Sequence, residues 1–316
     1  MGRLDPQVAG VLQRLPGIAR ERMTPEEARR ASRDRANLLR GTVEPVAHVR
    51  DTIASTPAGE IPLRVYAPEI AAGRSVPGLV YFHGGGWVLS DLDGPDALCR
   101  TLASRVECVV VSVAYPLAPE HKFPAALEAS HAATSWVAQN AAKLGVDADR
   151  IAVGGESAGG NLAATVALLA RDRGGPRLAF QLLLVPVIDY AFDTRSYLEN
   201  ADGYGLTRAE MMWFWHHYLR APVDGANPYA SPLRAHDLGG VPPALVVTAE
   251  FDPLRDEGDA YAERLRRASV PVEHRRYAGV VHGFLAMTAE VDIARQAVDD
   301  IARSARNALS GAAATP

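Results

Sequence analysis

The chain has 316 residues, of which 48% are hydrophobic and 22% charged, with a formal net charge of −4. This composition is ample for a large hydrophobic core and predicts a soluble globular protein. The balance of charge gives no electrostatic footprint for nucleic acid or an anionic membrane. No stretch is long and apolar enough for a membrane span, and the first residues contain no apolar targeting segment. We therefore expect a cytoplasmic protein without nucleic-acid or membrane partners.

Residues 1–45 are predicted to be helical and to lie apart from the sheet. Thr24-Pro25-Glu26-Glu27 has the features of a helix start, with Thr at the N-cap, Pro at the first helical position and Glu at the third. Strand-like runs follow at 46–53 and 61–66. The turn signal at 58–60 predicts that these two strands form an antiparallel hairpin.

From residue 79 onward, apolar strand-like runs alternate with amphipathic helical patterns. This alternation indicates a mostly parallel sheet that is covered by helices on both faces, with eight strands once the hairpin is included. The expected strands are 79–82, 108–115, 151–153, 179–185, 244–249 and 272–277, and the expected helices are 95–107, 124–142, 158–171, 255–269 and 291–309.

Residues 189–243 interrupt this alternation, because they contain no convincing strand. Their length is that of an insertion rather than a simple connection. They carry a bulky aromatic cluster at 211–218. Two interpretations stand side by side: the aromatic side chains line a substrate pocket within a helical cap, or they pack the insertion onto the core.

The two cysteines, Cys99 and Cys108, cannot form a disulfide framework and do not have the spacing of metal ligands. Cys108 begins an apolar run, which predicts a buried free thiol. We expect no metal site, since the histidines outside the candidate site also lack the spacing of metal ligands.

A nucleophile motif, G-x-S-x-G, occurs where the strand-like run 151–153 meets a helical pattern. Gly155 and Gly159 flank Ser157, and a turn this sharp requires small residues at both positions. The helix that follows would direct its unpaired N–H groups toward the serine hydroxyl. Ser157 is therefore the candidate nucleophile.

A serine nucleophile needs a base and a third group that orients the base. Asp252 follows the strand at 244–249 and His282 follows the strand at 272–277, both in loops at the carboxyl ends of parallel strands. The order Ser157, Asp252, His282 selects them as the triad, although an Asp before a Pro is commonly only a helix N-cap. Asp256 and Glu250 are rival acids, the first inside a helix and the second too close to its strand.

The developing negative charge of the reaction needs fixed N–H donors. Ala158, directly after the nucleophile, provides one. His83-Gly84-Gly85-Gly86-Trp87 follows the strand at 79–82. Gly84 and Gly85 are the preferred further donors, whereas Gly86 can serve instead to shape the turn.

Five motifs together resemble those of the bacterial hormone-sensitive-lipase family (family IV) of esterases, which has the α/β-hydrolase fold. They lie at 83–87, 115–125, 155–161, 252–258 and 282–284. The resemblance implies a serine carboxylesterase that hydrolyses short- to medium-chain carboxylic esters without a cofactor, and a homodimer formed through the last strand and helix. An amidase or formamidase on the same triad stays open, and a non-catalytic small-molecule receptor is disfavoured because His282 is present.

Two positions depart from the family's usual pattern: Glu156 stands where Asp is common, and Pro116 stands where Arg is common. The expected organisation is an α/β-hydrolase catalytic domain (46–188 and 231–310) with a helical cap made of residues 1–45 and 189–230. The substrate pocket is expected to include four aromatic residues from the motifs and the cap, namely Trp87, Trp213, Phe214 and Phe284.

Overall fold

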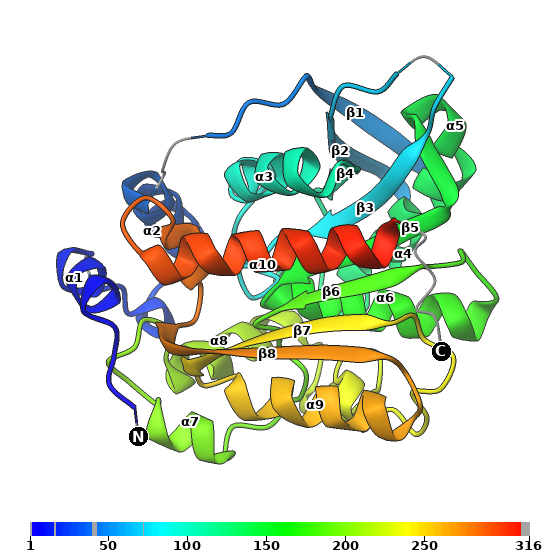
Figure 1. The fold of residues 1–316 in the computed structure, drawn as a ribbon. Coiled ribbons are helices and arrows are strands. Elements are labelled where there is room, and N and C mark those ends of the chain that lie inside the picture. The colour runs from blue at the N-terminus through cyan, green and yellow to red at the C-terminus, as the bar shows by residue number, and fades with distance from the viewer. Residues whose placement is uncertain (1, 16, 40–42, 72, 311–316) are drawn as a thin grey trace.

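In the computed structural model, which describes residues 2–15, 17–39, 43–71 and 73–310, one sheet runs through the centre of the molecule (Figure 1). Its eight strands lie in the order β1-β2-β4-β3-β5-β6-β7-β8. β1 and β2 pair antiparallel, as do β2 and β4, and all other neighbours are parallel. The strands are β1 His48–Thr56, β2 Gly59–Ala67, β3 Val76–Phe82, β4 Val109–Val113, β5 Val146–Glu156, β6 Phe180–Leu184, β7 Ala244–Phe251 and β8 Val272–Val281.

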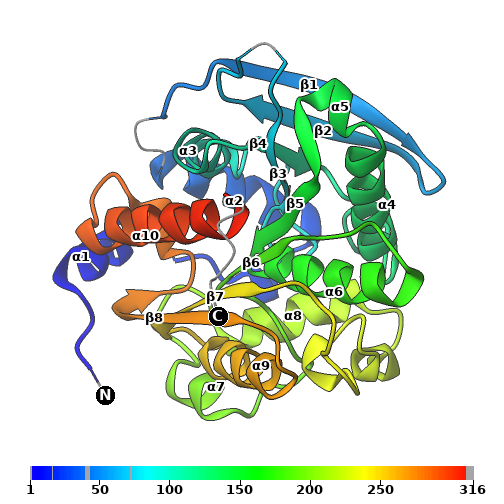
Figure 2. The same cartoon turned by 45° about the vertical axis from the view of Figure 1, so that its right-hand side comes forward.

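Helices cover both faces of this sheet, as the alternating pattern predicted. Figure 2 shows α3 and α10 on one side and α4, α6 and α9 on the other. The α-helices are α1 Pro6–Arg14, α2 Pro25–Leu39, α3 Asp96–Val106, α4 Ala125–Gln139, α5 Ala141–Leu144, α6 Ala158–Arg173, α7 Arg195–Glu199, α8 Arg208–Tyr218, α9 Arg255–Arg267 and α10 Asp292–Leu309. Short 3₁₀ turns are η1 Arg20–Arg22, η2 Pro222–Ala226, η3 Pro232–Arg234 and η4 Phe284–Met287.

The central strands are apolar because both of their faces are covered. Every residue of β4 and of β6 is buried. The edge strand β8 instead mixes partly buried and exposed residues until its last three positions, which are buried. Continuous burial in the middle and partial exposure at the edge are what a parallel sheet between two helical layers produces.

The predicted hairpin is present, but its turn lies slightly earlier than expected. β1 ends at Thr56 and β2 begins at Gly59, so the loop consists of residues 57 and 58. Gly59 has a φ of +104° and pairs with Thr56, and Glu60 already pairs with Ser55. The glycine closes the turn rather than standing at its centre, because only glycine adopts this backbone conformation without strain.

The N-terminal segment is helical as expected, and its predicted helix start is confirmed. The amide of Glu27 donates to Thr24 Oγ1 at 3.3 Å, while the amide of Thr24 donates to Glu27 Oε2 at 2.9 Å. Earlier in the segment, the amide of Asp5 donates to the carbonyl of Gly279 at 2.9 Å, which attaches it to β8.

The insertion at residues 189–230 contains α7, α8 and η2 and no strand among these described residues. It contacts the N-terminal segment through an ion pair, in which Arg20 Nη1 lies 2.5 Å from Glu210 Oε1. The Glu210 side chain has no exposed surface. The two segments predicted to form the cap are therefore joined by a buried charge pair.

None of the described helices combines the length and the apolar composition that crossing a bilayer requires.

Candidate active site

The sequence-predicted site residues meet at the carboxyl edge of the sheet. Ser157 directly follows β5, Asp252 follows β7 and His282 follows β8. The glycine-rich loop that starts at His83 follows β3, the neighbour of β5. The parallel strands bring these four chain segments to one edge, where open α/β sheets hold their ligands.

Ser157 occupies a strained turn between β5 and α6. Its φ is +58° and its ψ is −118°, a region that residues with a side chain rarely adopt. A Cβ added at Gly155 would lie 2.4 Å from the carbonyl of Gly159, and one added at Gly159 would lie 1.9 Å from the carbonyl of Phe82. Both flanking positions thus exclude any side chain, as the motif predicts.

Hydrogen bonds connect the three predicted triad residues in a row. Nε2 of His282 lies 3.0 Å from Oγ of Ser157, and Nδ1 lies 2.7 Å from Oδ2 of Asp252. The other carboxylate oxygen of Asp252 accepts the amide of Leu254 at 2.8 Å. With Nδ1 protonated toward the carboxylate, Nε2 is free to accept the serine proton.

The electrostatic surroundings favour a basic imidazole. Burial alone would lower the pKa of His282, but the charge and hydrogen bond of Asp252 raise it, and Glu156 and Glu210 add to this effect. The net result is a pKa above the ordinary value. A general base is most effective when its pKa lies near the working pH.

Glu156, the residue that departs from the family's usual Asp, lies at the end of β5 beside the nucleophile. Burial raises the pKa of its carboxyl group; His282 opposes this effect and Asp252 reinforces it. It makes no direct hydrogen bond to His282 among the bonds of the described residues. Glu156 therefore acts on His282 through its charge rather than through contact.

The three predicted oxyanion donors belong to segments beside the nucleophile, and their role stays a prediction. A Cβ added at Gly84 would lie 3.5 Å from Cβ of Ser157, which places the loop against the nucleophile. In the described part of the chain, the amides of Gly84, Gly85 and Ala158 have no hydrogen-bond acceptor. Ser157 is 8% exposed, and amides without an acceptor near a buried serine are consistent with the predicted role.

Sequence reasoning did not assign a role to the residues that hold this loop. His83 Nδ1 lies 2.7 Å from the carbonyl of Gly84, and the Tyr115 hydroxyl donates to the carbonyl of His83 at 2.7 Å. The His83 and Tyr115 rings stack with centroids 4.2 Å apart. Burial lowers the pKa of His83 to about 4, so its ring is neutral and can donate through Nδ1. The signal was present in the motifs, since both residues belong to them.

The two rival acids, Asp256 and Glu250, bond to groups other than His282. Asp256 lies in α9, where its carboxylate accepts the amide of Ser196 at 2.7 Å and pairs with Arg255 at 2.8 Å. Glu250 accepts the amides of Gly2 and Gly279. Neither carboxylate bonds to His282, so the geometry favours Asp252.

The aromatic residues of the insertion lie close to the oxyanion loop. A Cβ added at Gly86 would lie 2.1 Å from the Phe214 ring, and Gly86 itself has a φ of +59°. Trp213 is partly exposed and packs against Phe214, with ring centroids 5.2 Å apart. These contacts place Phe214 beside the loop, while its role in substrate binding stays a prediction, as does that of Trp213.

The same prediction for Trp87 and Phe284 needs correction. Both have no exposed surface. Trp87 stacks on Tyr218 with centroids 4.0 Å apart, and Phe284 packs beside Tyr277 in the core beneath α10. A side chain without accessible surface offers none to a substrate, so in this structure both are core residues.

No group of three or more His, Cys, Asp or Glu side chains in the described ranges is arranged to hold a metal ion. His274 pairs with Asp259 at 2.9 Å, but Thr248 binds the same ring nitrogen, so this trio does not form a relay. Cys99 and Cys108 are buried free thiols, as Cys108 was predicted to be.

Comparison with known proteins agrees with this geometry. A family model described as alpha/beta hydrolase fold matches residues 79–286. The chain is 47% identical to carboxylic ester hydrolase LipN of Mycobacterium tuberculosis over 75% of this chain and 64% of LipN. It is 41% identical to esterase LipI of the same organism over 94% and 92% of the two chains.

Among solved structures, a hyperthermophilic esterase from the archaeon Pyrobaculum calidifontis superimposes with a TM-score of 0.92 at 43% identity, covering 96% of this chain and 98% of that one. The family model, the two relatives and the solved structure all indicate the same family. The chain belongs to the alpha/beta hydrolase fold family and, within it, to the hormone-sensitive-lipase family whose motifs it carries.

Proposed function

We propose that this protein is a serine carboxylesterase that hydrolyses short- to medium-chain carboxylic esters through an acyl-serine intermediate. One observation carries the proposal: Ser157, His282 and Asp252 form a hydrogen-bonded row, and the glycine-rich loop lies against Ser157 at Gly84. The relatives named as a carboxylic ester hydrolase and an esterase support it.

The geometry supports the following course. Ser157 Oγ attacks the ester carbonyl carbon while His282 Nε2 accepts the hydroxyl proton. The amides of Gly84, Gly85 and Ala158 stabilise the oxyanion, and each such donor contributes about 3 kcal/mol to the transition state. His282 then gives its proton to the leaving alcohol. Asp252 holds the imidazole in the required tautomer and stabilises its charged form.

Water completes the cycle. His282, neutral again after the alcohol has left, accepts a proton from a water molecule that attacks the acyl carbon. The second tetrahedral intermediate collapses, and the proton returns to Ser157 as the carboxylic acid departs. None of these steps calls for a cofactor.

The test is hydrolysis of p-nitrophenyl butyrate by the purified protein and by Ser157→Ala. We expect the substitution to lower kcat by about 10⁴-fold or more, because the nucleophile is lost while the oxyanion donors remain. Wild-type turnover by Ser157→Ala would refute the proposal. A matched amide substrate separates the two chemistries, and a higher kcat/KM for the amide than for the ester would assign an amidase instead.

We also propose that residues 1–45 and 189–230 together form the cap, and that the protein acts in the cytoplasm as a homodimer through β8 and α10. β8 is the last strand of the sheet and pairs only with β7 among the described strands, so no described strand lies along its outer edge. Light scattering on the purified protein tests the dimer, and cell fractionation tests the location.

A further inference from the structure

Two helices that are distant in the sequence meet beside Asp252. α7 belongs to the insertion, whereas α9 follows the Asp252 loop directly. The Ser196 hydroxyl on α7 donates to the carbonyl of Pro253 at 2.6 Å, one residue after the acid. Ser196 has no exposed surface and Asp252 is 1% exposed, so water does not compete for this bond.

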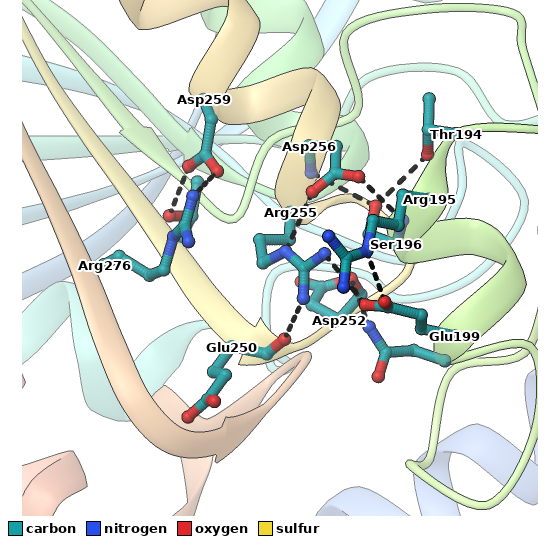
Figure 3. A network of polar contacts seen from close by, with 12 residues as sticks. Thr194, Arg195, Ser196, Glu199, Glu250, Asp252, Arg255, Asp256, Asp259 and Arg276 are labelled. Atoms are coloured by element: carbon teal, nitrogen blue, oxygen red, sulfur yellow. Dashed lines mark hydrogen bonds and ion pairs between the residues drawn. The ribbon is translucent and has the colours of Figure 1, made fainter. Parts of the chain in front are cut away.

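Each of the two helices also provides a hydrogen-bond acceptor for an amide in the first turn of the other. The amide of Ser196 donates to Asp256 Oδ2 at 2.7 Å, and the amide of Asp256 donates to Ser196 Oγ at 3.2 Å. Amides in the first turn of a helix have no partner within that helix. Each side chain therefore caps the other helix, and Figure 3 shows Ser196 facing Asp256 across this junction.

Further bonds connect α7 to the strand end that carries the acid. Arg255 donates to the carbonyl of Glu250 at 3.1 Å and to the Glu199 carboxylate at 3.3 Å (Figure 3). The side-chain amide of Asn200 donates to the carbonyl of Asp252 at 3.3 Å. The carbonyls of Glu250, Asp252 and Pro253 are thus all bound by α7 or by a residue attached to it.

These contacts add to the one that the loop makes within its own backbone, where the amide of Arg255 donates to the carbonyl of Asp252 at 3.2 Å. Proline has no N–H with which to anchor its own backbone. The Asp252 carboxylate accepts only the amide of Leu254 besides His282 among its described hydrogen bonds. The direction of the carboxylate toward His282 follows from the loop backbone, and Ser196 makes the shortest of the bonds from α7 to that backbone.

We propose that Ser196 is a positioning residue for Asp252, through which the insertion fixes the orientation of the triad acid. The proposal rests on the function given above, because it requires Asp252 to orient His282. It assigns the insertion a part in the chemistry as well as in covering the site.

The first test is Ser196→Ala, which removes the hydroxyl and adds no atom. We expect kcat for p-nitrophenyl butyrate to fall about tenfold with KM within about twofold, well short of the roughly 10⁴-fold loss expected when a triad acid is replaced. The acidic limb of the kcat/KM profile should move to lower pH, because a loosened Asp252 raises the pKa of His282 less, while Glu156 and Glu210 are unchanged.

Ser231→Ala is the matched control. Ser231 is also fully buried, donates to the carbonyl of Gly225 at 2.8 Å and accepts the amide of Tyr190 at 2.9 Å. It makes no hydrogen bond to the Asp252 loop among the described bonds. We expect a comparable loss of thermal stability from both substitutions, but an unchanged kcat for Ser231→Ala.

A double-mutant cycle with Asp252→Asn completes the test. If Ser196 acts through Asp252, Ser196→Ala lowers kcat by less than about twofold in the Asp252→Asn background. An undiminished tenfold effect in that background, or a wild-type kcat for Ser196→Ala alone, would overturn the inference and leave the esterase proposal standing. Wild-type activity of both Ser157→Ala and Asp252→Asn would instead overturn the proposed function. Should Ser196→Ala fail to fold, Asn200→Ala provides the same cycle.

Discussion

Replacing Gly159 by alanine tests whether the close approach of α6 to β3 sets the position of the nucleophile. The added Cβ would lie 1.9 Å from the carbonyl oxygen of Phe82 and 2.6 Å from that of His83. Real Cβ atoms are essentially never closer than 3.0 Å to such atoms, so a backbone segment has to move by more than an ångström. The segments available are the start of α6, which directly follows Ser157, and the end of β3, which leads to the oxyanion loop.

The expected cost follows from that displacement. A misplacement of about 1 Å at a catalytic group lowers the rate by about 100-fold, and overpacking costs about 1–3 kcal/mol of stability. We expect Gly159→Ala to lose about 100-fold in kcat for p-nitrophenyl butyrate, measured beside urea denaturation. Gly10→Ala is the control: it lies in helix α1, its nearest atom is the end of Arg14 at 3.7 Å, and it should keep full activity. A wild-type kcat for folded Gly159→Ala would refute the reasoning.

Three further predictions concern the surroundings of the site. Glu156→Gln should move the acidic limb of the kcat/KM profile to lower pH. Glu156 raises the pKa of His282, and only the neutral imidazole accepts the serine proton. An unmoved limb in stopped-flow pH profiles would contradict this prediction. Arg29→Ala should lower the free energy of unfolding by about 2 kcal/mol in urea titrations, because Arg29 donates to the carbonyls of Val88 and Ala118. Its exposed ion pair adds little to this loss. A loss below about 0.5 kcal/mol would count against the prediction. Phe214→Ala should lower the free energy of unfolding by about 3 kcal/mol, because it truncates a buried side chain. It should also raise the ratio of kcat/KM for octanoate esters to that for butyrate esters, because it opens space beside the oxyanion loop. An unchanged ratio would show that Phe214 does not line the pocket.

The strands and the three predicted triad residues could be read from the sequence because their signals are local. A buried parallel strand is a short apolar run, and Ser157 is marked by glycines whose close contacts leave no room for a side chain. Asp252 and His282 each follow such a run. Chain order fitted both Asp252 and Asp256, and the helical pattern that includes Asp256 favoured Asp252.

The features that could not be predicted from the sequence depend on contacts between distant segments. The bond from Ser196 to Pro253 joins residues 57 positions apart, and no periodicity marks either one. Trp87 was assigned to the pocket from its place in the oxyanion motif, yet its stacking on Tyr218 buries it completely. Aromatic residues near a site are shared between core and pocket, and only packing decides which role each one has.

The attachments of the N-terminal segment have a consequence for the order in which the molecule is assembled. Arg20 finds its partner Glu210 190 residues later, and Gln7 bonds to Asp292 285 residues later. At synthesis rates of about 5–20 residues per second, roughly 10–40 s pass between the emergence of Arg20 and that of Glu210. Helix α1, which buries Val8 and Val11, contacts β8 and η4, and both of these elements emerge later still. On the ribosome, α1 and η1 are therefore made well before the elements onto which they dock.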